Sequence, residues 1–310
     1  MFRTPGCKNQ FCSRSGLLFG LLFAFVSASA NANGFLDGSL ASGWEDNITR
    51  GFSGSDQHNS PFLGVSLSGG KLYQLRTNTS LVLAGSASYH TFSSVQGLNR
   101  FNLTADVSLQ QKFGLGPYSP RLSLGASIGR DELKGGERDR YLYAVELGFS
   151  KRLNQSWNVN FGASRETSRG FNERDVNFSS LPNATGATRP TDPMDYYNNI
   201  FFGSLDYEFA SGWLLTGSHQ TIDGYIVPSA VPPVASLFKH AKALAIDPAF
   251  SRLQVLYLLK SRSSVWGTNL SVPLGADSAV DFAYSWQDID ADHVGSYQNF
   301  QFSINLIHRF

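Results

Sequence analysis

The sequence alternates between apolar and polar residues in stretches of about ten residues, and this pattern returns along most of the chain. Residues 100–113 show it most clearly. One parity of that stretch carries Phe101, Leu103, Ala105, Val107, Leu109 and Phe113, and the other carries Arg100, Asn102, Thr104, Asp106, Ser108, Gln110 and Lys112. A period of two places successive side chains on opposite faces of a β-strand. Each stretch therefore predicts a strand with one apolar face, long enough to cross a bilayer at a tilt.

The alternation recurs in residues 141–150, 157–164 and 280–287, while helical periodicity is almost absent. After residue 32 the sequence contains no continuous apolar run of the roughly 20 residues that a transmembrane helix requires. A closed ring of such strands would turn its apolar faces to lipid and its polar faces to an inner lumen. We therefore predict an all-β fold, a transmembrane antiparallel up-and-down β-barrel.

The connections between these stretches are alternately short and long, as in membrane barrels with short periplasmic turns and longer external loops. Short turns are expected at Arg76–Thr79, Gly114–Pro120, Asn154–Ser156, Ser211–Gly212 and Gly275–Asp277, and longer loops at Ser53–Ser60, Ser93–Leu98, Leu133–Arg138, Gly170–Tyr196, Gly224–Ser251 and Asp290–Gly295. These eleven connections predict about twelve strands and place both termini in the periplasm. Aromatic residues beside the short turns predict an interfacial girdle; they are Tyr73, Phe113, Tyr118, Trp157, Phe209 and Trp213.

Two segments leave the strand count open between about ten and fourteen. The first predicted strand, Leu36–Thr49, alternates less cleanly than the others. The segment Arg252–Leu274 is too long for one membrane crossing, and its parity slips near Ser264. It is either one strand that continues beyond the membrane or a loop hairpin followed by a strand.

The N-terminus has the three parts of a secretory signal. Residues 1–14 carry three basic residues and no acidic residue, and an apolar run follows at Leu17–Val26. Small residues at positions 28–32 then fit a signal-peptidase site. We predict that residues 1–32 are cleaved and that residues 33–310 form the barrel.

Removal of the signal changes the composition of the chain. Cys7 and Cys12 are its only cysteines, so the mature protein would have neither disulfides nor thiolate metal sites. Arg3, Lys8 and Arg14 leave as well, so that 22 of the 25 basic residues face 24 acidic ones. This balance provides no basic surface for nucleic acid, which is excluded as a partner.

The C-terminus alternates up to its last residue. Phe300, Phe302, Ile304, Leu306 and Phe310 share one parity, and Gln301, Ser303, Asn305 and Arg309 share the other. A terminal Phe on such a strand resembles the assembly signature of Gram-negative outer-membrane β-barrels, and Trp44–Arg50 resembles the first strand of porin-like members. This resemblance, which names no subfamily, implies a location in the cell outer membrane. It also implies lipid or lipopolysaccharide and the barrel-assembly machinery as partners.

Deleting Phe310 should lower membrane insertion more than it lowers secretion, because the resemblance implies that the terminal Phe is read after export. Fractionation of cells that express the truncated chain measures both steps. Equal insertion with and without Phe310 would count against the signature.

The polar parity of the predicted strands supplies candidate lumen-lining residues of both signs. They are Arg100, Asp106, Lys112, Arg121, Arg140, Glu146, Arg152, Asp206, Glu208 and Asp281. Such residues either brace a barrel as a plug of ion pairs or line a narrow aqueous path, because twelve strands fall between filled and open barrels. With mixed charges we expect no steep ion selectivity, since selective filters use rings of one sign.

Two long loops differ in character. Gly224–Ser251 is rich in apolar residues, which must be buried somewhere. It could constrict the barrel mouth, lie on the membrane, receive a hydrophobic ligand, or form a lid on neighbouring loops; we favour the lid, because compact long loops usually pack on themselves. Gly170–Tyr196 is rich in Asn, Ser, Thr and Pro and predicts an external segment.

No catalytic, metal or cofactor site follows from the sequence. Ser218 and His219 are adjacent, so on a strand they face opposite sides and cannot form a nucleophile–base pair with each other. No group of His, Asp and Glu has metal-ligand spacing. The leading hypothesis is a passive or gated channel for small solutes. The alternatives are a lipid-active enzyme of the outer membrane and a non-conducting adhesin or assembly protein.

Overall fold

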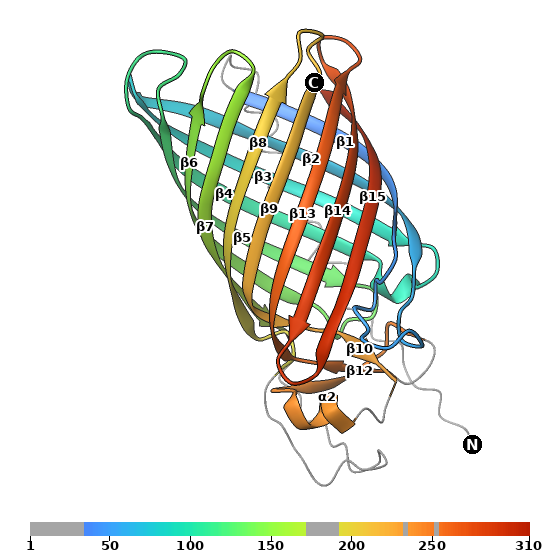
Figure 1. The fold of residues 1–310 in the computed structure, drawn as a ribbon. Helices are drawn as coiled ribbons and strands as arrows, with labels where there is room; N and C mark the ends of the chain where they lie inside the picture. The colour runs from blue at the N-terminus through green and yellow to red at the C-terminus, as the bar shows by residue number, and fades with distance from the viewer. Residues whose placement is uncertain (1–33, 172–191, 232–234, 251–253) are drawn as a thin grey trace, which may run out of the picture.

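The computed structural model describes residues 34–171, 192–231, 235–250 and 254–310. Twelve strands form one closed barrel in the order β1-β15-β14-β13-β9-β8-β7-β6-β5-β4-β3-β2, and the neighbours in the ring are antiparallel (Figure 1). The ring consists of β1 (Gly34–Glu45), β2 (Ser60–Arg76), β3 (Thr79–Phe92), β4 (Arg100–Lys112), β5 (Arg121–Leu133), β6 (Arg140–Arg152), β7 (Trp157–Gly170), β8 (Tyr196–Glu208), β9 (Leu214–Ile226), β13 (Leu259–Pro273), β14 (Ser278–Ala291) and β15 (Gly295–Arg309). The predicted count of twelve is confirmed.

The barrel is closed by pairing between its first and last strands. β1 pairs with β2 on one side and with β15 on the other. The backbone N–H of Phe310 donates to the carbonyl of Leu36 at 2.9 Å. Beside it, Arg309 Nε donates to Asp37 Oδ1 at 2.8 Å. No free strand edge is therefore left along this seam.

The two ends of the barrel differ, and we call them the turn end and the cap end. The short connections 77–78, 113–120, 153–156, 209–213 and 274–277 all lie at the turn end, where the C-terminus also lies (Figure 1). The six aromatic residues of the predicted girdle lie at or beside these turns, and all are exposed on the barrel surface. The longer connections lie at the opposite, cap end, among them the one containing the 3-10 helix η1 (Gln96–Leu98).

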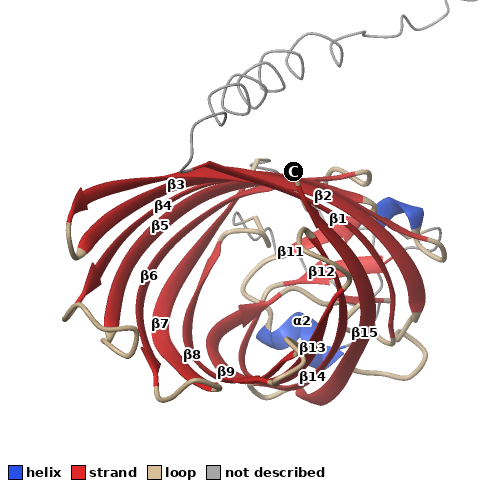
Figure 2. Ribbon diagram, turned by 90° about the horizontal axis from the view of Figure 1, so that it is seen from above, coloured by secondary structure: helices blue, strands red, loops and turns tan. Residues whose placement is uncertain are grey.

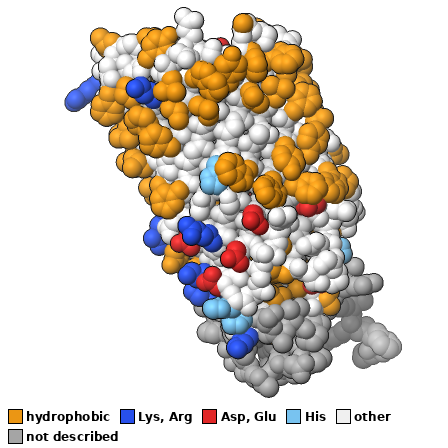
Figure 3. Space-filling view, in the orientation of Figure 1, with side chains coloured by type: hydrophobic (Ala, Val, Ile, Leu, Met, Phe, Trp, Pro, Cys, Tyr) orange, Lys and Arg blue, Asp and Glu red, His pale blue; other side chains and the backbone are white. Residues whose placement is uncertain are grey.

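The outer wall of the barrel is apolar over a broad band, which Figure 3 shows in orange. Leu63, Val145 and Phe201 are 60%, 57% and 61% exposed, values that a water-soluble sheet would not tolerate in such number. The residues between them along each strand have the opposite parity and face the lumen. This arrangement is that of a barrel surrounded by hydrocarbon.

The loop between β9 and β13 folds into a small unit of its own, which we call the cap (residues 227–258). It contains β10 (Ser229–Ala230), α2 (Ala235–His240), β11 (Leu244–Asp247) and β12 (Gln254–Tyr257). The three strands form an antiparallel sheet in the order β10-β12-β11. The cap lies at the cap end and, viewed along the barrel, inside the outline of the ring (Figure 2).

The structure settles both segments that left the strand count open. β1 ends at Glu45, so Asp46–Thr49 belong to the following loop, where Asn47 and Thr49 are buried and hydrogen-bonded. The described part of the second segment, residues 254–274, contains the loop strand β12 followed by the barrel strand β13. The register of β13 with β9 and β14 is continuous through Ser264, so the slip in apolar parity there is not a break in the strand.

Residues 1–32, the predicted secretory signal, lie outside the described residues. Among the residues that the structure describes, no helix is long and apolar enough to cross a membrane.

Replacing Val107 by Arg should destabilise the barrel by roughly 2–4 kcal/mol, because it moves a charge into the middle of the lipid-facing wall. Val107 lies near the centre of β4, pairs with Leu83 and Ala126, and is 40% exposed. Urea-induced unfolding in lipid vesicles measures the loss. Ser108→Arg is the matched control, since the next residue faces the lumen and should cost much less. Equal losses would mean that Val107 does not face lipid.

Candidate functional site: a capped lumen

The inner wall of the barrel is lined mainly by small side chains at mid-height. The strand register places short residues on the lumen side of nearly every strand; they include Ser39, Ser66, Ser86, Ser127, Gly148, Gly162, Ser204, Ser218, Gly267, Ser285 and Ser303. Ser39 and Ser66 hydrogen-bond to each other at 2.7 Å. A barrel of about eight strands is just wide enough for its side chains to fill. Twelve strands with short inward side chains therefore enclose a lumen that the wall does not fill.

The register places the ten predicted lumen residues on the inward face of their strands. Each has the parity opposite to the exposed apolar residues of its own strand. Only some of them meet: Arg152 Nη2 lies 3.0 Å from Glu208 Oε2, and Lys112 is paired in register with the like-charged Arg121. Asp206 instead accepts hydrogen bonds from the amides of Asn158 and Asn160 at 2.9 and 3.0 Å.

A second polar group lies in the lumen near the cap end. Arg140 donates from Nε and Nη2 to Asp131 Oδ2 at 3.1 and 3.0 Å, and its Nη1 contacts the Tyr196 hydroxyl. The other oxygen of Asp131 accepts from Asn102 Nδ2 at 2.7 Å. Asp131 was not among the predicted residues, although it has the same parity on β5 as Arg121 and could have been found that way.

These ion pairs do not form a plug. Among the described residues, the lumen pairs lie at the two ends of the barrel: Arg309–Asp37 and Arg152–Glu208 at the turn end and Arg140–Asp131 near the cap end. The inward charges nearest mid-height, Asp106 and Glu146, have no ion pair in the described part of the chain. The ion pairs of the described inner wall therefore lie toward its two ends rather than across its middle.

The cap packs against widely separated parts of the ring. Leu237, Val255 and Tyr257 share a buried cluster with Ile289 of β14 and Tyr297 of β15. Other cap residues pack beside Tyr196 of β8, and a third cluster joins the cap to β3, β5 and the loop after β1. Because β14 and β5 lie on opposite sides of the ring, a unit that reaches both must cross the mouth.

In the third cluster, the backbone of the cap lies very close to the backbone of η1. Ala249 and Phe250 pack beside Val95, which precedes η1, and Leu98, its last residue. A Cβ added to Gly97 would lie only 2.3 Å from the Cα of Ala249, so this position accepts glycine alone. The long apolar loop of the sequence is thus a lid packed on its neighbours, one of the predicted arrangements.

A buried ion pair ties the cap to the loop between β5 and β6. Arg138 Nη2 donates to Asp247 Oδ2 at 2.9 Å and to Ser229 Oγ at 2.7 Å. The Asp247 side chain is fully buried, and Ser229 also hydrogen-bonds to it. The backbone N–H of Ser229, in β10, donates to the carbonyl of Thr49, in the loop after β1, at 3.0 Å. The sequence carried no signal for this tie, because its members come from loops whose arrangement only the fold decides.

The cap has a buried hydrophobic interior. Tyr257 is wholly buried, stacks edge-on against Phe238 at 5.6 Å, and its hydroxyl has no hydrogen-bond partner among the described residues. Burial raises the pKa of the Tyr257 phenol above its usual value. The cap thus combines a small core of its own with contacts to the strands and loops at the rim.

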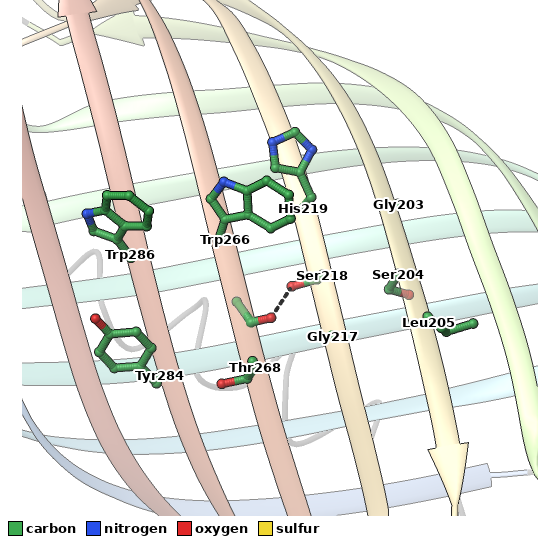
Figure 4. A pocket seen from close by; sticks show the side chains of 11 residues that line it. Gly203, Ser204, Leu205, Gly217, Ser218, His219, Trp266, Thr268, Tyr284 and Trp286 are labelled. Carbon is green, nitrogen blue, oxygen red and sulfur yellow. Dashed lines mark hydrogen bonds between the residues drawn. The ribbon is translucent and has the colours of Figure 1, made fainter.

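A separate depression of about 550 Å³ lies on the lipid-facing side of β8, β9, β13 and β14 (Figure 4). Trp266, Tyr284 and Trp286 form its walls, and glycines of β8 and β9 deepen it. It lies outside the lumen, so it offers room for hydrocarbon rather than a route for solutes.

The side chains of Ser218 and His219 lie on opposite sides of the barrel wall, as predicted for adjacent residues of a strand. Ser218 faces the lumen, while His219 packs on Trp266 outside, with ring centroids 4.2 Å apart. His219 Nε2 lies 2.9 Å from the hydroxyl of Ser264 on β13. In the described part of the chain no carboxylate hydrogen-bonds the His219 ring, so the pair lacks the third group that orients the base in a catalytic triad. The described residues also contain no group of three or more His, Cys, Asp or Glu that could hold a metal ion.

No protein-family model matches the sequence, and no curated protein sequence matches it. Among solved structures, an outer-membrane channel from Pseudomonas putida F1 is similar with a TM-score of 0.56 and 12% identity, covering 91% of this chain and 97% of that one. The NanC porin (TM-score 0.44, 10% identity, 87% and 98% covered) and the CymD monoaromatic hydrocarbon channel (0.43, 11%, 90% and 88%) are more distant. With its closed ring of twelve strands and its apolar outer wall, the chain has the fold of the porin-like outer-membrane β-barrels.

Proposed function

We propose that this protein is an outer-membrane channel for small solutes and that the cap is its gate. The observation that carries the proposal is a lumen lined by small polar residues and closed at one mouth by a separately folded lid. A barrel that served only as a membrane anchor would need neither feature. The similar Pseudomonas putida structure is an outer-membrane channel, which agrees with this reading.

The way the cap is attached supports a gate. The chain enters the cap from β9 and leaves it into β13. These two strands lie side by side, with Ile226 paired to Leu259. The other attachments of the cap are the hydrophobic clusters that it shares with barrel strands and rim loops, and a few polar bonds. Opening about the β9–β13 hinge would separate these contacts and leave the strand pairing of the ring intact, as in lids that open on a rigid scaffold.

The inward charges along the barrel indicate which solutes the channel would pass. The ten inward residues Arg100, Asp106, Lys112, Arg121, Arg140, Glu146, Arg152, Asp206, Glu208 and Asp281 include five of each sign. Such a lining suits small polar solutes and gives no steep preference for cations or anions. Single-channel reversal potentials in a salt gradient should accordingly stay near zero. A strongly selective reversal potential would contradict this lining.

A disulfide between the cap and the rim tests the gate. A Cβ built on Gly135 lies 3.4 Å from the Cα of Ala249, so Gly135→Cys with Ala249→Cys brings the two sulfurs within bonding reach. In planar bilayers the intact protein should open briefly and repeatedly. The oxidised double variant should stay closed and regain these openings on reduction. Openings that persist unchanged in the oxidised variant would overturn the role of the cap.

Orientation and assembly belong to the same proposal. We infer that the turn end faces the periplasm, with both termini there, and that Phe310 is read by the barrel-assembly machinery. The solvent-exposed Phe310, 73% exposed beside the closing seam, is accessible for such recognition.

A further inference from the structure

The outer wall changes from apolar to polar partway along several strands. On β7 the outward residues run from Trp157 to Ala163 and then become Arg165, Thr167 and Arg169. Figure 3 shows charged side chains gathered between the orange band and the cap end. This border is where hydrocarbon gives way to lipid headgroups.

Three outward arginines from β5 and β7, the two strands that flank β6, lie at this border. Arg130 on β5 and Arg169 on β7 are both paired in register with Tyr141 of β6, on opposite sides of it. Arg165 lies four residues nearer the turn end than Arg169, on the same face, and is paired with the exposed Val145. Neighbouring strands lie about 4.8 Å apart, so Arg130 and Arg169 are separated by roughly twice that spacing at the backbone. Arg165 and Arg169 both lean toward β8, where Arg165 lies over Tyr197 and Arg169 lies near Asp195.

Aromatic rings hold these guanidinium groups in place. Arg130 lies 5.0 Å from the ring centroid of Phe171, which itself packs on Tyr141 at 4.4 Å. Arg165 lies 4.5 Å above the ring of Tyr197. Cation–π stacking fixes the plane of a guanidinium and leaves its N–H edge free for a planar or tetrahedral anion.

The charge balance of this patch differs from that of the wall on the other side of β8. Arg130 contacts Glu132, and Arg169 Nη1 lies 3.6 Å from Asp195, but Arg165 has no carboxylate partner in the described part of the chain. The patch therefore keeps one unpaired positive charge. On β13, by contrast, Arg262 is paired in register between Asp223 and Asp290.

We propose that Arg130, Arg165 and Arg169 form a binding site for the phosphate of an anionic lipid in the leaflet at the cap end. Arginine binds phosphate through two parallel N–H donors, and such charge-assisted bonds are about twice as strong as neutral ones. The apolar wall below the patch, which includes Val145 and Phe161, would hold the acyl chains of the same molecule.

Native mass spectrometry of the detergent-solubilised full barrel tests the site. The ligands are lipid A with its phosphates, the same lipid after dephosphorylation, and inorganic phosphate. The intact protein should retain phosphorylated lipid A, and dephosphorylation should weaken binding by more than about tenfold, since about tenfold is the loss expected for a single charge-assisted hydrogen bond. Arg165→Gln, which removes one of the three arginines, should weaken it by about tenfold, and Arg165→Lys by less.

Arg262→Gln is the matched control, since it removes an outward arginine that lies between two carboxylates and should leave lipid binding unchanged. Heat-modifiable gel mobility shows that each variant is folded. Equal binding of the phosphorylated and dephosphorylated lipids would overturn the site, as would an equal loss in Arg165→Gln and Arg262→Gln. Displacement of lipid A by an equal concentration of inorganic phosphate would overturn the assignment to a lipid.

Discussion

Removing the cap should turn an intermittently open barrel into one that conducts steadily. The deletion of residues 227–258 can be made cleanly, because Ile226 and Leu259 already face each other across β9 and β13. An Asn-Gly pair inserted between them forms the two-residue turn that suits such a hairpin. The twelve barrel strands stay intact, and the small residues of the inner wall then line an uninterrupted path.

Single-channel recording in planar bilayers measures the change. We expect long-lived openings in the deletion variant where the intact protein shows short ones, and faster uptake of small sugars by liposomes that contain it. The oxidised Gly135→Cys/Ala249→Cys variant is the closed reference. A deletion variant that is folded by gel mobility but shows no conductance would mean that the lumen is not a passage.

Arg138→Ala should destabilise the attachment of the cap to the barrel by about 3–5 kcal/mol, the loss expected when a buried ion pair is left with one charge. Asp247 is fully buried and Arg138 is 15% exposed, so little water replaces the lost guanidinium. The remaining partners of the carboxylate, the Ser229 hydroxyl and the backbone N–H of Ala249 at 3.1 Å, do not neutralise it. The variant should open more often and exchange cap amide hydrogens faster, while the barrel strands stay protected.

A double replacement separates this effect from a general loss of packing. Arg138→Met with Asp247→Leu removes both charges and keeps the volume, so it should recover much of the cap stability, as apolar replacements of buried pairs often do. The coupling between the two sites follows from the double-mutant cycle. If Arg138→Ala exchanged no faster than the intact protein, the tie would not hold the cap.

The architecture of the ring could be predicted because the alternation of apolar and polar residues within each strand identifies its two faces. In β4 the alternation from Arg100 to Lys112 fixes the lipid side and the lumen side by parity alone. The short turns marked by Gly114, Gly212 and Gly275 carry positive φ angles of 118°, 82° and 156°, a conformation that favours glycine. Local chemistry therefore determines where each strand ends.

The cap could not be predicted in the same way, because its structure depends on contacts between distant loops. Leu237, Val255 and Ile289 are apolar residues of three separate segments, and nothing in their spacing shows that they share a core. The pairing of His219 with Ser264 likewise depends on the register between β9 and β13. Register between strands is a property of the closed ring rather than of either strand.

The seam between β1 and β15 also has a consequence for biogenesis. Asp37 and Arg309, which bond across it, are 272 residues apart along the chain. Until the final strand arrives, the sheet has two bare edges, whose unpaired amides cannot be exposed to hydrocarbon. A chain that is clipped before β15 can therefore be neither a smaller barrel nor a partial one, and clearance by periplasmic proteases is its expected fate.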